Sequence, residues 1–256
     1  MSVISELEKF YFNFGGEKFI IGKSERGKPL YCFKVKKTGY PVAIIQYAIH
    51  AREYITTYLA IEQIKAYNLT GVRGTVYFIP AVNPDGIDKV LKGDRLYKAN
   101  ANGVDLNVNF PARWGKGVKN VRVKGSENFI GKFPLSESES RALYDFTLKI
   151  NPNVTVSYHA KGEEIYWQFF QDEKTATRDL ILAKEISAVT GYPLVPTPNS
   201  AGGYKDWCID SLKIPALTIE VGADELSHPI EKENLQKILG KNITVINAVT
   251  ESKIWN

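Results

Sequence analysis

The sequence is poor in cysteine and in long apolar runs, and each shortage excludes a class of protein. Its two cysteines among 256 residues, Cys32 and Cys208, cannot build a disulfide framework and belong to no C-x-x-C pair. We expect two free, buried thiols and a reducing compartment, the cytoplasm. The longest strongly apolar run, Pro41–Ile49, is far shorter than the roughly 20 residues that span a membrane. The N-terminus also lacks the basic start and apolar core of a signal peptide.

Histidine is scarce and charge is nearly balanced. The chain has 33 basic and 28 acidic side chains, a net charge of +5, and the basic residues are scattered. The densest cluster, Lys116–Lys124, is interpreted as a solvated loop, so we expect no nucleic-acid partner, although a positive surface could steer an anionic substrate. Apolar residues at 44% and charged residues at 24% are typical of a globular protein. No repeat or linker divides the chain, which predicts one domain, 1–256.

Short β-rich runs alternate with amphipathic stretches along the chain. Several runs are apolar throughout, as in strands covered on both faces. This alternation predicts an α/β fold, a three-layer α/β/α sandwich with a largely parallel central sheet, in which working residues lie at the carboxyl ends of strands. The predicted strands are Leu30–Val35, Val42–Ile49, Thr75–Val82, Val154–His159 and Ala216–Val221, and the predicted helices are Tyr54–Tyr67, Glu137–Ile150, Lys174–Val189 and Glu231–Thr250. Ser136–Glu139 has the spacing of a capping box.

Two of the three histidines follow or end predicted strands. His50 and Glu53 lie at a strand-to-helix turn with a spacing that suits two zinc ligands, and His159 ends another strand as a natural third ligand. Three protein ligands with one open position are typical of catalytic zinc. The third histidine, His228, repeats the His-x-x-Glu spacing in a loop and is interpreted as a surface or capping residue. Taken singly, each of these patterns is weak.

A carboxylate inside a predicted apolar strand is the fourth unusual feature. Glu220 lies in Pro215-Ala-Leu-Thr-Ile-Glu220-Val-Gly, where burial is costly unless the group is paired or functional. Beside a metal ion it would serve as a general base. A structural ion pair explains the residue equally well when it is considered alone.

Taken together, these motifs resemble zinc metallocarboxypeptidases. The match rests on six motifs in family order: His50-Ala-Arg-Glu53, Asn83-Pro-Asp-Gly86, Gly103-Val-Asp-Leu-Asn107-Val-Asn109, Ser157-Tyr-His159, Gly202-Gly-Tyr-Lys-Asp-Trp207 and Thr218-Ile-Glu220. The resemblance implies a mixed sheet of about eight strands, one zinc ion bound by His50, Glu53 and His159, and Glu220 as general base and then general acid. The phrase His159–Trp167 is most similar to the bacterial branch of γ-D-glutamyl-meso-diaminopimelate peptidases and murein peptide amidases.

The resemblance also implies residues that contact the substrate. Arg52 and Asn107 match family positions that hold a terminal carboxylate or its neighbouring carbonyl, and Lys98 falls near the family's carbonyl-polarising arginine. Lys205 falls at a specificity position, where it would receive the side-chain carboxylate of diaminopimelate or, alternatively, lie exposed on a helix. Tyr204 and Trp207 are expected to wall the pocket or to belong to the core.

One departure from the family concerns the carboxylate clamp. The family's Asn-Arg-Asn is Asn107-Val108-Asn109 here, and valine offers neither charge nor donors. We therefore expect hydrolysis of an amide in peptidoglycan-derived peptides, with a small muropeptide as partner and no membrane. The alternatives are a conventional carboxypeptidase, a related zinc N-acyl amino acid deacylase, and a binding module without catalysis. Oligomeric state is left open.

Overall fold

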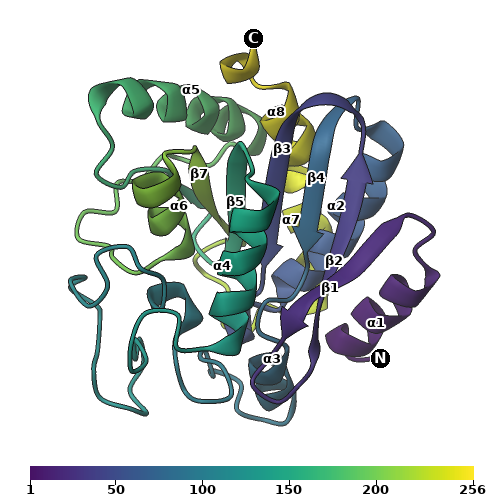
Figure 1. The fold of residues 1–256 in the computed structure, drawn as a ribbon. Helices are drawn as coiled ribbons and strands as arrows, with labels where there is room; N and C mark the ends of the chain where they lie inside the picture. The colour runs from purple at the N-terminus through teal and green to yellow at the C-terminus, as the bar shows by residue number, and fades with distance from the viewer.

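A single mixed sheet organises the chain. The computed structural model describes residues 1–256 and contains seven strands in the order β1-β2-β4-β3-β5-β7-β6. Figure 1 labels β1 to β5 and β7. The central strands β4, β3, β5 and β7 run parallel, whereas the edge pairings β1–β2, β2–β4 and β6–β7 are antiparallel. Their bounds are β1 Glu17–Lys23, β2 Pro29–Lys36, β3 Thr38–Tyr47, β4 Arg73–Ile79, β5 Val154–Ala160, β6 Glu164–Tyr166 and β7 Ala216–Val221.

Helices cover both faces of this sheet, which confirms the predicted α/β/α layers. One face packs against α1 Val3–Asn13, α2 Ile55–Thr70, α5 Glu173–Thr190, α7 Leu235–Asn242 and α8 Val245–Glu251, and the other against α4 Ser138–Ile150 and α6 Tyr204–Leu212 (Figure 1). The short α3 spans Pro84–Leu91. Every residue of β5 is buried, because helices cover both of its faces. None of the helices combines the length and hydrophobicity needed to cross a bilayer.

Most predicted elements are present, and three details differ. The sheet has seven strands where the resemblance implied about eight. The predicted helix Glu231–Thr250 is broken into the turn η3 Lys232–Asn234, α7 and α8. The helix start expected at Ser136–Glu139 is present, but the capping box is not, since Glu137 is the N-cap of α4 and its side chain makes no capping bond. Cys32 and Cys208 are free and buried, as predicted.

Candidate metal centre and active site

Three parallel strands deliver the predicted site residues to one end of the sheet. His50 follows β3, and the short turn η1 Ala51–Glu53 places the side chain of Glu53 beside that of His50. His159 lies near the end of β5, and Glu220 is its direct partner in the β5–β7 register. The convergence at carboxyl strand ends is the arrangement predicted from sequence.

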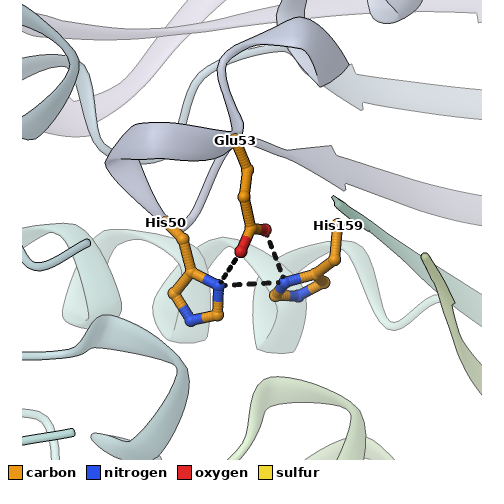
Figure 2. Close-up of side chains that lie close together, drawn as sticks. All are labelled: His50, Glu53 and His159. Atoms are coloured by element: carbon orange, nitrogen blue, oxygen red, sulfur yellow. Dashed lines mark hydrogen bonds and ion pairs between the residues drawn. The ribbon is translucent and has the colours of Figure 1, made fainter. Parts of the chain in front are cut away.

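The side chains of His50, Glu53 and His159 point at one another (Figure 2). Nδ1 of His50 is 2.8 Å from Oε1 of Glu53, and Nδ1 of His159 is 3.0 Å from Oε2 of the same carboxylate. The two Nδ1 atoms are 3.2 Å apart. All three side chains are buried. Such close approach of two imidazoles and a carboxylate is costly unless a cation or proton lies among them.

This donor set fits zinc. Bonds of about 2.0–2.1 Å in a tetrahedral site place neighbouring ligand atoms about 3.3 Å apart, close to the separations between these three side chains. Burial by itself would raise the pKa of Glu53, but the imidazoles of His50 and His159 hold that pKa well below its usual range. Glu53 is therefore ionised, as a metal ligand must be. Three protein ligands leave a fourth position for water or substrate.

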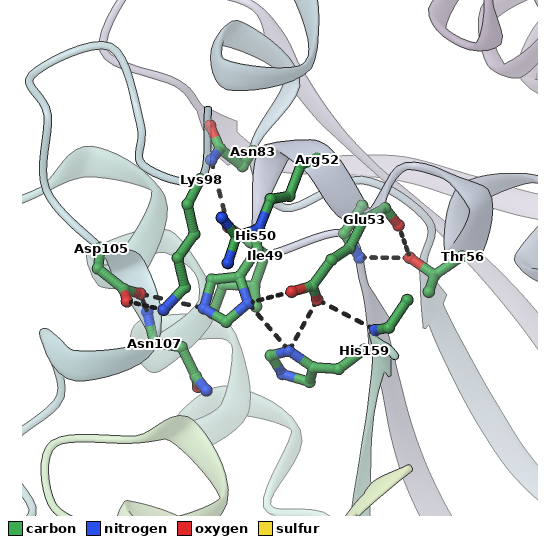
Figure 3. Close-up of polar contacts among 12 residues, drawn as sticks. Ile49, His50, Arg52, Glu53, Thr56, Asn83, Lys98, Asp105, Asn107 and His159 are labelled. Atoms are coloured by element: carbon green, nitrogen blue, oxygen red, sulfur yellow. Dashed lines mark hydrogen bonds and ion pairs between the residues drawn. The ribbon is translucent and has the colours of Figure 1, made fainter. Parts of the chain in front are cut away.

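Asp105 supports this centre from behind, and sequence reasoning missed it. Its Oδ1 lies 3.1 Å from Nε2 of His50, and its Oδ2 lies 2.7 Å from Nζ of Lys98 (Figure 3). Burial opposes ionisation of Asp105, yet Lys98 and His50 lower its pKa far below the usual range. A carboxylate on the outer nitrogen fixes the ring orientation of a metal-binding histidine. The available signal was a carboxylate in an apolar setting, Gly103-Val104-Asp105-Leu106.

Lys98 is held beside the metal centre as a fixed positive charge. Its Nζ donates to Oδ1 of Asn128 at 2.6 Å as well as pairing with Asp105. Burial lowers the pKa of this ammonium, but Asp105 outweighs that effect and raises it. Lys98 lines the same cavity as His50 and Glu220, and is therefore placed to polarise a carbonyl there.

Glu220 faces the cavity from β7. Burial raises its pKa to about 8, although His159 opposes the rise. A divalent cation on the neighbouring ligands would favour the ionised form and lower this pKa. A carboxylate whose proton affinity is tuned near neutrality beside a metal centre suits proton transfer in both directions.

A polar cavity of about 360 Å³ opens in front of these residues. Only four of its 23 lining residues are hydrophobic. Asn107 lines it, and because its Oδ1 accepts the backbone N–H of Tyr204 at 3.3 Å, its Nδ2 is the group left to donate. Val108, at the departure from the family motif, lines the cavity too. The lining cations are Lys98, Lys119 and Lys205.

Lys205 is a buried wall of the cavity rather than an exposed helix lysine. It is 6% exposed, and its Nζ donates to Oδ1 of Asp206 at 2.6 Å and to the carbonyl of Gln168 at 2.9 Å. Asp206 also lines the cavity. An ion pair buried against a binding cavity meets the condition that buried charges be paired, while keeping a cation within reach of a ligand.

Three predicted residues lie outside the cavity lining. The Tyr204 side chain is fully buried, its hydroxyl is 2.8 Å from that of Thr147, and its ring packs against Phe110 and Trp207, so both aromatics belong to the core. Arg52 turns away to Oε1 of Glu127 at 3.0 Å and the carbonyl of Leu96 at 3.2 Å. Tyr204 lies outside the cavity because its buried hydroxyl pairs with that of Thr147. Arg52 lies outside it because its guanidinium pairs with the carboxylate of Glu127.

His228 is more enclosed than the surface or capping residue expected from the sequence. It is half-buried, its Nδ1 is buried without a hydrogen-bond partner, and burial lowers its pKa. It is absent from the group of side chains close enough to share a metal ion.

Two imidazoles, a carboxylate ligand and a flanking glutamate on an α/β sheet define the class of zinc hydrolases. The chain belongs to the zinc carboxypeptidase family, whose model matches residues 16–239. This assignment agrees with the resemblance that the six sequence motifs indicated.

Individual relatives include a γ-D-glutamyl-L-diamino acid endopeptidase and a murein peptide amidase. The chain is 32% identical to γ-D-glutamyl-L-diamino acid endopeptidase 1 of Lysinibacillus sphaericus over 221 residues, 72% of this chain and 55% of that protein. It is 31% identical to murein peptide amidase A of Escherichia coli strain K12 over 223 residues, 80% of this chain and 83% of that one. It thus spans little more than half of the first relative.

The fold is shared more widely. The structure of bovine thrombin-activatable fibrinolysis inhibitor, solved with a tick carboxypeptidase inhibitor, superposes with a TM-score of 0.82 at 23% identity, covering 97% of this chain and 95% of that one. This likeness concerns the fold alone.

Proposed function

We propose that the protein is a zinc-dependent peptidase, a single catalytic domain of residues 1–256, that hydrolyses the γ-D-Glu–diaminopimelate amide in peptidoglycan-derived peptides. The observation that carries the proposal is a buried lysine, Lys205, in a polar cavity beside the His50–Glu53–His159 group. The names of two relatives, a γ-D-glutamyl-L-diamino acid endopeptidase and a murein peptide amidase, support it. The two free thiols support a cytoplasmic location.

Each residue of the site has a separate role in the proposed hydrolysis. Bound zinc would supply Lewis acidity at the scissile carbonyl and lower the pKa of water. Glu220 takes a proton from the attacking water and returns it to the leaving amine. Lys98, fixed by Asp105 and Asn128, donates to the oxygen that gains negative charge in the transition state. Arg52 holds the neighbouring loop through Glu127 and serves the site indirectly.

Substrate recognition must proceed without the family's clamping arginine, because Val108 carries no charge. Lys205 lies within the cavity and is proposed to receive the side-chain carboxylate of diaminopimelate. Asn107 Nδ2 is proposed to hold a neighbouring carbonyl or carboxylate. A conventional C-terminal carboxypeptidase would need a clamp that position 108 no longer provides.

The decisive experiment is hydrolysis of L-Ala-γ-D-Glu-meso-diaminopimelate by zinc-loaded protein, with products identified by mass spectrometry. We expect release of diaminopimelate by the wild type and a loss of at least about 10²-fold in Glu220→Gln, since general acid–base catalysis contributes about 10²–10⁴. Glu220→Gln should still bind zinc, measured by metal analysis. Absence of cleavage by zinc-loaded wild type would refute the proposed substrate, and a near-normal rate in Glu220→Gln would refute the base.

Specificity is tested at Lys205. Lys205→Ala should lower kcat/KM for the diaminopimelate peptide about 10-fold or more relative to the corresponding lysine peptide, which lacks the distal carboxylate. Lys184→Ala, an exposed lysine of α5, is the matched control. If Lys205→Ala left the ratio of the two substrates unchanged, Lys205 would be a structural partner of Asp206 only.

A further inference from the structure

The net positive charge of the chain is concentrated in one segment. Residues 113–132, here called the basic segment, carry six basic side chains and one acidic side chain, a net +5 that equals the net charge of all 256 residues. The remainder of the chain is therefore neutral. All six basic side chains are exposed. They are Arg113, Lys116, Lys119, Arg122, Lys124 and Lys132.

These charges are not neutralised within the protein. Ion pairs join basic and acidic side chains over much of the molecule, but none of them includes a basic residue of the segment. The segment's single acid, Glu127, is engaged by Arg52 at 3.0 Å. Because no internal carboxylate pairs with these cations, their field extends into solvent.

The segment borders the catalytic cavity and is fixed against it. Four consecutive residues, 117–120, and Asn128 belong to the cavity lining. Asn120 Nδ2 donates to the carbonyl of Ala201, another lining residue, at 3.3 Å, and its Oδ1 accepts the N–H of Gly117 at 2.9 Å.

Aromatic contacts hold the rest of the segment. Trp114 Nε1 donates to the carbonyl of Ile130 at 3.1 Å, and the Arg122 guanidinium lies 4.7 Å from the Trp114 ring. Val121 and Phe129 pair as an isolated bridge. These contacts thus hold the basic segment in a fixed position beside the cavity.

We propose that the basic segment is an electrostatic capture surface for carboxylate-rich peptides, which it draws into the neighbouring cavity. The inference rests on the proposed function, because a γ-linked glutamyl-diaminopimelate peptide carries several carboxylates and fewer ammonium groups. A positively charged surface next to a cavity raises the rate of encounter with an anionic ligand. This effect is lost as salt screens the charges.

The first test compares two triple variants of equal charge change. Lys116→Gln/Lys124→Gln/Lys132→Gln removes three segment charges that form no ion pair and do not line the cavity, whereas Lys149→Gln/Lys174→Gln/Lys184→Gln removes three exposed charges of α4 and α5. The segment variant should lose about threefold to tenfold in kcat/KM for the anionic tripeptide, with kcat unchanged. The α4/α5 variant should match the wild type.

Ionic strength gives the second contrast. The loss should vanish as ionic strength rises from about 0.01 M to about 0.15 M, which shortens the Debye length from about 30 Å to about 8 Å. A tripeptide with amidated carboxylates should show no difference between variants. Equal kcat/KM for the two triple variants at low salt, or a loss that salt does not change, would overturn the capture surface.

A binding measurement separates this inference from the proposed function. ¹⁵N-labelled protein is titrated with γ-linked tri-D-glutamate at low salt, which tests capture without cleavage. Amide shifts within residues 113–132, alone or together with shifts of cavity-lining residues, that are abolished in the segment variant support capture, even if the tripeptide is not cleaved. No shifts there would refute capture whether or not cleavage occurs. Shifts induced only by long-chain polyphosphate, and not by triglutamate, would reassign the surface to a polymeric anion and also overturn the proposal.

Discussion

At the residue scale, the carboxylate of Asp105 connects the metal-binding group with the ammonium of Lys98. Asp105 accepts from His50 on one oxygen and pairs with Lys98 on the other (Figure 3). His50, Glu53, His159 and Glu220 could be predicted from the sequence, because scarce histidines and a carboxylate that is costly to bury in a strand are local features. The role of Asp105, and the choice between pocket wall and core for Tyr204, could not be predicted, because which groups meet across loops depends on contacts between residues far apart in the chain.

Asp105→Asn should weaken zinc binding about 10- to 100-fold, since the amide no longer offers a charged acceptor to Nε2 of His50. Zinc affinity is measured by competition with a chromophoric chelator. Asp88→Asn, which removes a carboxylate paired with Lys28 elsewhere on the molecule, is the control and should leave affinity unchanged. Equal affinity in wild type and Asp105→Asn would contradict the supporting role.

At the scale of elements, the start of α6 depends on close packing of two loops. Gly202 has φ of +85°, and a Cβ there would lie 2.7 Å from the carbonyl oxygen of Val108. Its N–H also donates to the carbonyl of Ala112 at 2.7 Å. This contact places Lys205 at the cavity, because α6 begins two residues later at Tyr204.

Gly202→Ala should lower the free energy of unfolding by more than about 2 kcal/mol, because it combines strain at positive φ with a backbone clash. Gly240→Ala provides a control of opposite sign. Gly240 lies within α7, where an added Cβ would meet no heavy atom within 4 Å, so alanine there should stabilise by roughly 0.5–1 kcal/mol. Denaturant unfolding measures both, and a neutral Gly202→Ala would show that the loops can separate freely.

The start of α4 contains a buried acid whose ionisation opposes folding. Glu139 is fully buried, accepts from the N–H of Glu25 and from Asn100, and burial raises its pKa from 4.5 to about 7. The folded state therefore holds a proton that the unfolded chain releases above about pH 4.5. Stability contributed by this proton is complete below that pH, declines as pH rises, and is lost above about pH 7.

Glu139→Gln should remove this pH dependence, because the amide stays neutral at all pH values. Relative to wild type, the variant should gain on the order of 1–3 kcal/mol between about pH 5 and pH 8, at about 1.4 kcal/mol per pKa unit. Thermal melting across that range provides the measurement. If Tm changed with pH in the same way in both proteins, ionisation of Glu139 would not lower the free energy of unfolding.

At the scale of the whole molecule, local patterns predicted layers but not topology. The five predicted strands and three of four predicted helices are present because apolar runs and 3.6-residue periodicity are local properties. Strand number, strand order and the break between α7 and α8 are set by pairing and packing between distant segments. The edge strands β1 and β6, half-exposed along much of their length, gave no comparable signal.

The metal should be dispensable for folding. The ligands lie on a sheet whose larger core cluster contains 43 buried residues, so the site is formed by the fold. Removal of zinc by chelation should abolish hydrolysis while leaving the far-ultraviolet circular dichroism unchanged and lowering Tm only by the linkage of binding to folding. Loss of secondary structure on chelation would contradict this prediction and show that the domain needs its metal ion to fold.

The register of β5 and β7 has a consequence for how the chain tolerates changes in length. His159 and Glu220 are direct partners on adjacent strands, so their separation is set by the sheet and not by the residues that connect the strands. Insertions in the surface connections between β5 and β7 leave this pair in place. A single residue inserted within β7 before Glu220 turns its carboxylate to the opposite face of the sheet.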